Sequence, residues 1–303
     1  MTAFRLGINT CFAVKRWAEP SSWAAIVRDR LGLELVQHSL DLVALDGPEE
    51  LWADQARAVA DACADRGIEM HSTFTGLAAY SSNLLLHPDR AARDWAERWY
   101  ERAIAFTASA GGRATGGHVG ALTVDDARDP ARRDARLREL RERLARLARR
   151  ARAEGLEALF VENLASAREP STMAGVEALL TEGSDEAVPI VLCLDVGHQC
   201  VPGTSGDERD PYAWLRTMGA RAPVVQLQQS DELGDHHWPF TSRTDPSGRI
   251  DPERVLDQLE ASGAEAVALV FEIIPPFEQD DDEVLDDLRT SVERWRAALV
   301  GRG

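Results

Sequence analysis

Acidic and amide side chains stand at the ends of four short apolar runs, and their types suit a metal cation. Asp195 ends one such run, and His198 follows it one helical turn later. Glu162, Gln228 and Glu272 occupy comparable places in LFVEN, VVQLQQSD and ALVFEII. Three carboxylates and one amide oxygen are hard donors, which Mg²⁺ and Mn²⁺ prefer more than Zn²⁺ does. We therefore predict a divalent-metal site made by Glu162, Asp195, Gln228 and Glu272.

These side chains require a scaffold that brings strand ends together. Short apolar runs alternate with amphipathic helices eight times, which is typical of parallel β-α-β units. The predicted strands are Phe4–Asn9, Leu33–His38, Ile68–Phe74, Ala114–Gly120, Leu156–Glu162, Pro189–Asp195, Val224–Gln229 and Val267–Ile273. The predicted helices are Ser22–Arg30, Glu49–Arg66, Asp89–Ala110, Asp129–Ala153, Thr172–Leu180, Pro211–Gly219, Pro252–Ser262 and Asp282–Leu299. This order predicts an α/β protein, a single (β/α)8 TIM barrel that forms one domain over residues 1–303, with its site at the carboxyl ends of the strands.

Each acidic residue taken alone has a simpler explanation. A carboxylate at a strand end can cap the following helix or form a buried ion pair. The metal prediction therefore depends on the set, because consecutive strands of a barrel aim their ends at one point.

Three histidines are candidate substrate ligands. We expect His71 and His118 at the ends of strands three and four, on the same face as the acidic residues. A single buried histidine is more often an ordinary core residue, but two at equivalent strand ends favour function. His198 could hydrogen-bond a substrate oxygen or support a metal ligand from behind.

Two loops could bind a polyol or a phosphate. The segment after His71, STFTGLAAYSSN, is rich in hydroxyl groups, and the long loop Ser230–Arg249 contains His236, His237 and Arg243. We predict that Arg243 binds a substrate phosphate. The alternatives are ordinary turn chemistry for the first loop and a solvated arginine for the second.

Composition excludes several classes of partner. The formal net charge of −17 over 303 residues opposes binding to nucleic acid.

The sequence contains no run of 18 apolar residues, so a transmembrane helix is not expected. The first residues do not resemble a signal peptide. The four cysteines show no CxxC spacing, so a reducing cytoplasm is expected. Barrels of this size often self-associate, which leaves a homo-oligomer open, although no interface pattern is visible.

The order Glu162, Asp195-Val-Gly-His198, Gln228, Glu272 resembles the xylose isomerase-like TIM barrel superfamily of sugar isomerases and epimerases. The resemblance extends over nearly the whole chain. Within this group, the segments LGINTCFAVKRW, HSTFTGLAAYSSNLLLHPD, LQQSD and DHHWPFT are similar to erythrulose-phosphate 3-epimerases of tetritol catabolism.

The resemblance implies roles for particular residues. In ketose 3-epimerases of this group, four strand ends hold one divalent metal, and the first and last glutamates also exchange the proton. Those catalytic roles would fall on Glu162 and Glu272, and His198 would contact substrate oxygens. Gln228 departs from the pattern, because these epimerases usually have a metal-binding histidine there.

Inversion at C3 of a 2-ketose is consistent with this set of residues. The C3 proton is α to the carbonyl, and its removal leaves an enediolate whose charge a divalent ion stabilises. One glutamate would remove the proton and the other would return it on the opposite face. We therefore expect a Mn²⁺- or Mg²⁺-dependent epimerase of a ketose or ketose phosphate. Alternatives on the same fold are another sugar isomerase, a polyol dehydratase, an apurinic endonuclease and a non-catalytic sugar-binding barrel.

Overall fold

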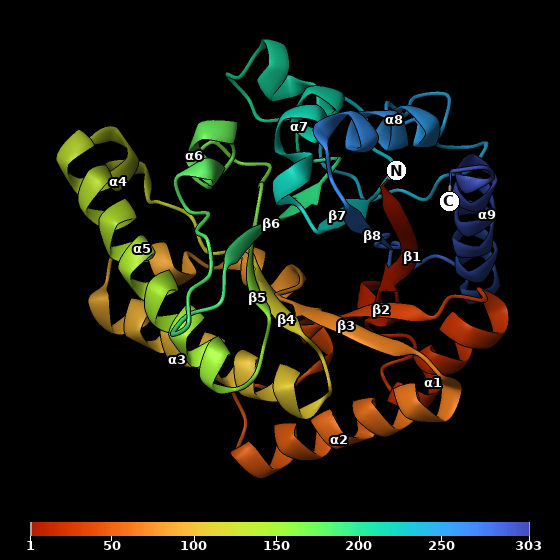
Figure 1. The fold of residues 1–303 in the computed structure, drawn as a ribbon, viewed down its shortest axis with the longest axis horizontal. Helices are drawn as coiled ribbons and strands as arrows, with labels where there is room; N and C mark the ends of the chain where they lie inside the picture. Colours follow the sequence, from red (N-terminus) through yellow and green to blue (C-terminus); the bar gives the residue numbers. More distant parts are fainter. Residues whose placement is uncertain (1, 303) are drawn as a thin grey trace.

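The computed structural model describes residues 2–302, so the two ends of the predicted domain, Met1 and Gly303, lie outside it. Its centre is a closed barrel of parallel strands in the order β1 to β8 (Figure 1). The strands are β1 Ala3–Asn9, β2 Leu35–Ser39, β3 Glu69–Phe74, β4 Ala114–Gly117, β5 Ala158–Glu162, β6 Ile190–Asp195, β7 Val224–Leu227 and β8 Ala266–Phe271. The predicted (β/α)8 TIM barrel is confirmed.

The helices surround the barrel (Figure 1). The α-helices are α1 Pro20–Ala25, α2 Glu49–Arg66, α3 Arg90–Ser109, α4 Val124–Arg128, α5 Pro130–Ala153, α6 Met173–Glu177, α7 Pro211–Met218, α8 Pro252–Ser262 and α9 Asp281–Leu299. A π-helical turn, η2 Ile26–Arg30, continues α1. The 3₁₀ helices are η1 Thr10–Ala13, η3 Leu40–Leu42, η4 Leu77–Ser81, η5 Leu84–Leu86, η6 Gly206–Arg209 and η7 Gly219–Arg221.

Helix α4 was not predicted from the sequence because it is short. Its five residues lack the spacing of an amphipathic helix, although Thr123 caps its first turn by accepting a hydrogen bond from the Asp126 amide. The longer helices have the expected ends. Asp129 caps α5, and α2 stops at Gly67, whose φ of 60° suits a residue without a side chain.

Alternation along the strands brings every second side chain into the barrel. A central apolar cluster contains Phe160 of β5, Cys193 of β6 and Val270 of β8. The residue two positions further along each of these strands points the same way, at the carboxyl end. Glu162, Asp195 and Glu272 occupy those positions, so the strand period itself directs the three carboxylates inward.

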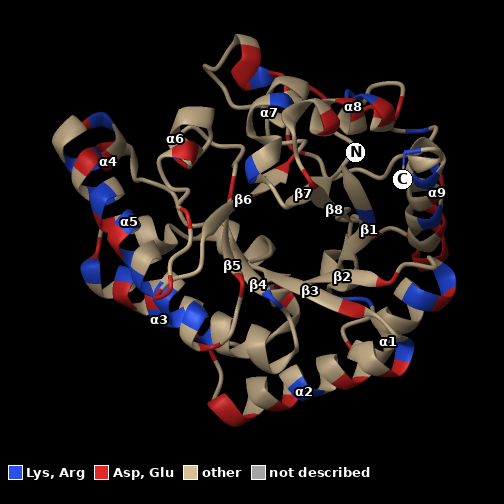
Figure 2. Ribbon diagram, viewed as in Figure 1, with Lys and Arg blue, Asp and Glu red and all other residues tan. Residues whose placement is uncertain are grey.

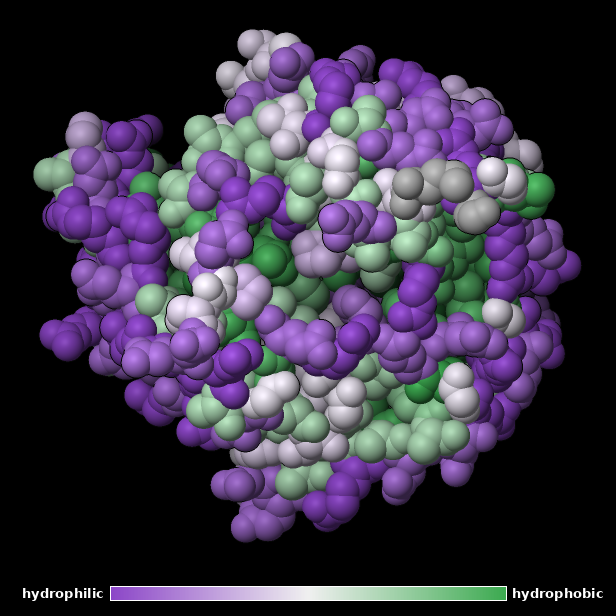
Figure 3. Space-filling model, in the orientation of Figure 1, coloured by the Kyte–Doolittle hydropathy of each residue, from purple (hydrophilic) through white to green (hydrophobic). Residues whose placement is uncertain are grey.

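Charged residues lie mainly on the outer helices (Figure 2). The Arg-rich helix α5 carries acidic residues among its basic ones, and Arg143 pairs with Asp94 and Glu97 of α3. On the face in Figure 3, hydrophilic residues cover most of the periphery, and hydrophobic residues gather toward the centre. Within residues 2–302, no helix is both long and apolar enough to cross a membrane.

Candidate metal and catalytic site

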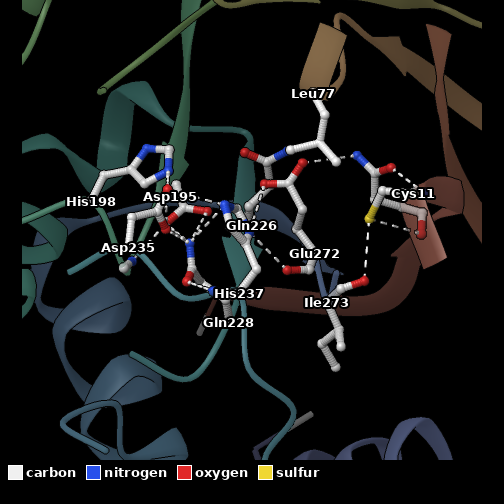
Figure 4. Close-up of polar contacts among 12 residues, drawn as sticks. Cys11, Leu77, Asp195, His198, Gln226, Gln228, Asp235, His237, Glu272 and Ile273 are labelled. Atoms are coloured by element: carbon white, nitrogen blue, oxygen red, sulfur yellow. Dashed lines mark hydrogen bonds and ion pairs between the residues drawn. The ribbon is translucent and has the colours of Figure 1, made fainter. Parts of the chain in front are cut away.

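The strand-end carboxylates converge on one buried site (Figure 4). Glu162 and Asp195 are completely buried, and Glu272 is 4% exposed. A carboxylate oxygen of Asp195 lies within 4.8 Å of ligand atoms of Glu162 and His198. Asp195 also has a carboxylate oxygen within 4.8 Å of ligand atoms of His237 and Glu272. The structure therefore brings together the three predicted carboxylates.

The donor set fits a bound cation. Glu162 Oε1 and Glu272 Oε2 are buried, and neither has a hydrogen-bond partner among the described residues. Four carboxylates, including that of Asp235, surround only two imidazoles, so the ionised carboxylates would outnumber the positive charges even with both rings protonated. Buried charge without a partner is costly, and a divalent cation would neutralise this excess.

Gln228 lies in the cluster, and its amide oxygen already accepts one hydrogen bond. The Gln228 Oε1 atom accepts a hydrogen bond from the His237 backbone N–H at 2.6 Å. Because a backbone N–H can only donate, this contact establishes which end of the amide is oxygen. The amide nitrogen donates to Asp195 Oδ1 at 3.0 Å and to Asp235 Oδ1 at 2.8 Å. These contacts favour a role for Gln228 in holding the carboxylates in place over the predicted role as a metal ligand.

His237 and Asp235 lie in the site, although neither was predicted as a metal ligand and His237 was named only among possible phosphate donors. Both come from the loop after β7. His237 Nδ1 lies 3.1 Å from the Glu272 backbone oxygen, which can only accept, so Nδ1 carries the proton and Nε2 faces the cluster. Asp235 Oδ2 lies 3.2 Å from His237 Nε2 and 3.2 Å from His198 Nε2. The available signal was an Asp-x-His pair inside an unusually long loop, since such loops are often functional.

His198 is held between two neighbouring strands. Its Nδ1 donates to the Asn163 backbone oxygen at 2.7 Å, which leaves Nε2 directed at Asp235. The Asn163 side chain also bonds both backbone groups of Asp195, at 2.8 and 2.9 Å. Asn163 therefore fixes the end of β6 against β5, together with the ring that follows it.

The pKa values follow burial and the excess of carboxylates. Burial raises the pKa of Glu162 to about 8, and it raises the pKa of Glu272 well above its usual range. Burial alone would lower the pKa of His237, but Asp235 and the other carboxylates raise it to about 10. The same balance raises the pKa of His198 well above its usual range. Burial opposes ionisation of Asp235, yet His198 and His237 hold its pKa well below the usual range.

His71 does not join this cluster. It is the third residue of β3, three positions before the strand ends at Phe74. Its pKa is lowered to about 4 by burial and by the charge of Arg113, which lies just before β4. The expectation that His71 ends strand three is therefore wrong, because the strand continues to Phe74 and a register shift leaves His71 opposite no residue of β2.

His118 lies immediately after β4 and borders the site. Its ring stacks on Tyr80 with the centroids 4.6 Å apart. Neither ring nitrogen has a hydrogen-bond partner within residues 2–302, and burial lowers the pKa of His118 to about 4. A neutral imidazole with a free nitrogen can contact a substrate hydroxyl group.

Arg243 and the hydroxyl-rich loop have other partners. Arg243 forms an ion pair with Asp287 of α9 at 2.5 Å, and its side chain is 59% exposed. This contact is on an outer helix, so the predicted phosphate role loses its support. Ser81 and Asn83 donate to backbone oxygens, while Thr75 accepts from the His118 amide. These contacts stabilise the loop itself.

Gly197 provides a sharp test of the site's packing. A Cβ at this position would lie 2.3 Å from Gln228 Cδ, so Gly197→Ala must displace the Gln228 amide. We expect a destabilisation of about 1–3 kcal/mol by overpacking and a Mn²⁺ affinity roughly 10–100-fold weaker, as for a lost supporting contact. Denaturant unfolding and Mn²⁺ titration measure both.

Gly175→Ala in α6 is the matched control for that substitution. Its new methyl group would meet only Thr172 Oγ1 within 4 Å, at 3.0 Å. Mn²⁺ affinity should be unchanged in this variant. A Gly197→Ala protein that binds Mn²⁺ like the unmodified chain would show that Gln228 does not support the ligands.

Comparisons with known proteins agree with this geometry. The Xylose isomerase-like TIM barrel family model matches residues 29–296. The D-erythrulose 1-phosphate 3-epimerase of Brucella abortus (strain 2308) is 28% identical over 97% of this chain and 96% of its own. A putative xylose isomerase structure from Rhodospirillum rubrum ATCC 11170 is 35% identical, with a TM-score of 0.90 over 97% of this chain and 99% of that one.

A more distant structure shares the fold alone. The D-psicose 3-epimerase of Clostridium cellulolyticum H10, solved with D-tagatose, is 14% identical, with a TM-score of 0.69 over 97% of this chain and 99% of that one. The family match covers most of the barrel, including all of the residues that form the site. The chain therefore belongs to the Xylose isomerase-like TIM barrel family and is an enzyme of the sugar isomerase and epimerase type.

Proposed function

We propose that this enzyme is a divalent-metal-dependent 3-epimerase of a short 2-ketose phosphate, erythrulose phosphate. The observation that carries the proposal is a pair of buried glutamates, Glu162 at the end of β5 and Glu272 directly after β8, each with one oxygen free of hydrogen bonds in the described chain. The substrate's length and phosphate rest on the Brucella abortus relative, whose name is D-erythrulose 1-phosphate 3-epimerase.

Glu162, Asp195, His237 and Glu272 are the proposed metal ligands. Three carboxylates with one imidazole favour Mn²⁺ over Mg²⁺, because imidazole is a softer donor than oxygen. A cation held there would polarise the ketose carbonyl and stabilise the negative charge of an enediolate. Asp235 and Gln228 would orient the ligands through the contacts described above.

The two glutamates perform the proton transfers in this proposal. One removes the C3 proton as a general base, and the other donates a proton to the opposite face of the planar carbon. His198 lies beside Glu162 and His118 stacks on Tyr80, and both would bind substrate oxygens. A 1,2-isomerase would instead move a proton between C1 and C2 along one face. The two reactions therefore differ in the carbon that exchanges its proton, C1 or C3.

Proton NMR in D₂O tests the reaction class directly. The enzyme is incubated with Mn²⁺ and a panel of ketoses and ketose phosphates, including D-erythrulose phosphate. We expect solvent deuterium at C3 together with a new diastereomer. Exchange at C1 with an aldose product would indicate a 1,2-isomerase, and loss of water would indicate a dehydratase. Full activity in exhaustively metal-free protein would reject the metal requirement.

Metal affinity should depend steeply on pH. In the metal-free protein the pKa of Glu162 is about 8 and that of His237 about 10, so both groups hold protons at pH 7. Ligand atoms must lose these protons, and protons therefore compete with the cation. Raising the pH from 6 to 8 should tighten Mn²⁺ binding by at least ~10-fold per unit.

Calorimetry in two buffers of different ionisation enthalpy measures the accompanying proton release. At pH 7 we expect at least one proton released for each Mn²⁺ bound. An affinity that stays constant between pH 6 and 8 would contradict the assigned ligands.

A further inference from the structure

Each proposed catalytic glutamate is held through only one of its two oxygens. Tyr80 donates its O–H to Glu162 Oε2 at 2.6 Å. Asn9 Nδ2 lies 3.3 Å from Glu272 Oε1. The other oxygen of each carboxylate, Glu162 Oε1 and Glu272 Oε2, is buried without a hydrogen-bond partner in residues 2–302. The two sides of the site therefore share one arrangement, in which a neutral donor contacts one carboxylate oxygen and the other oxygen has no hydrogen bond.

The loop that carries Tyr80 is built onto the barrel. Asp41, which follows β2, accepts hydrogen bonds from the Leu77 and Ala78 amides at 2.6 and 2.9 Å. Gly76 allows this approach, because its φ is 75° and a Cβ there would lie 2.5 Å from the Asp41 carboxyl carbon. The Tyr80 ring then stacks on His118, which places its hydroxyl group at Glu162.

Asn9 belongs to a polar layer inside the barrel. Its Nδ2 atom also donates to Gln37 Oε1 at 2.9 Å, and Gln226 donates to the same oxygen at 2.9 Å. Asn9 Oδ1 meanwhile accepts from the Cys11 amide at 2.9 Å and caps η1. Two strands and a helical turn therefore fix the donor that faces Glu272.

We propose that Tyr80 and Asn9 are positioning residues, one for each face of the substrate, that fix the orientation of the Glu162 and Glu272 carboxylates between the metal and C3. The proposal rests on the two-base epimerase function proposed above. A carboxylate anchored at one oxygen cannot rotate freely, so the other oxygen keeps its direction. Small misplacement of a reacting group costs up to ~100-fold in rate. Loss of one anchor should therefore slow proton transfer on one face only.

Face-specific deuterium exchange tests this assignment. In the Glu272→Gln background, exchange at C3 depends on Glu162, and adding Tyr80→Phe should slow it ~10–100-fold. In the Glu162→Gln background, the same Tyr80→Phe change should leave exchange by Glu272 unaltered. Asn9→Ser should produce the converse pattern. Serine retains the cap of η1 but does not reach Glu272, and Gln37 keeps its bond from Gln226.

Tyr212→Phe is the matched control, because the Tyr212 hydroxyl donates to the Arg249 backbone oxygen away from the two glutamates. It should change neither exchange rate. Mn²⁺ content and unfolding midpoint are measured for every variant, and both should remain unchanged by Tyr80→Phe. Equal slowing on both faces, or no slowing on either, would overturn the positioning roles. If the two Glu→Gln proteins exchange the same epimer, the two-base function itself fails, which is a separate result.

Discussion

Glu162→Gln and Glu272→Gln should each abolish net inversion at C3 while retaining bound Mn²⁺. Glutamine keeps an oxygen that can bind the cation but lacks the carboxylate that accepts and returns a proton. The expected loss is ~10²–10⁴-fold, the usual contribution of one general acid or base. The surviving glutamate can still remove and return the proton on its own face.

The two variants should therefore incorporate deuterium from D₂O into C3 of opposite epimers. Proton NMR of each pure epimer, incubated with each variant, measures this directly, and metal analysis verifies that Mn²⁺ remains bound. Glu169→Gln is a suitable control, because Glu169 is an acidic residue outside the proposed ligand set. A variant that still inverts C3 at nearly the original rate would assign that glutamate to metal binding alone. Exchange into the same epimer by both variants would place both glutamates on one face and contradict the two-base mechanism.

His237→Ala should weaken Mn²⁺ binding by more than ~100-fold, beyond the 10–100-fold typical of a supporting residue. The His237 ring is oriented by the Glu272 backbone oxygen and presents Nε2 to the carboxylates. Removing it deletes a proposed ligand. Activity should fall with the metal content and recover partly at high Mn²⁺ concentration.

Gln228→Met is the matched comparison, because it keeps side-chain length and removes the amide. The structure uses that amide to hold Asp195, Asp235 and the His237 backbone, so a loss of about 10–100-fold is expected. Mn²⁺ titration monitored by electron paramagnetic resonance measures both variants. A larger loss for Gln228→Met than for His237→Ala would restore Gln228 as the ligand and reject His237.

The barrel and its three carboxylates could be predicted from local pattern. Strand residues alternate between two faces, so Glu162 must share a face with Phe160, and Asp195 with Cys193. Parallel strands in a closed barrel then bring these ends together, whatever the loops do. The position of His71 was harder to predict, since a register shift between β2 and β3 leaves His71 without a paired residue in β2.

The sequence alone determined the barrel, the strand-end carboxylates and the acidic surface, because each depends on periodicity or composition that neighbouring residues already contain. Tertiary structure decided the roles of Gln228, His237, Asp235 and Tyr80. The contact between the Gln228 oxygen and the His237 amide, nine positions away, could not be read from the local pattern. Tyr80 reaches Glu162 across 82 positions. Such contacts depend on how loops pack over the barrel, and no local period encodes that packing.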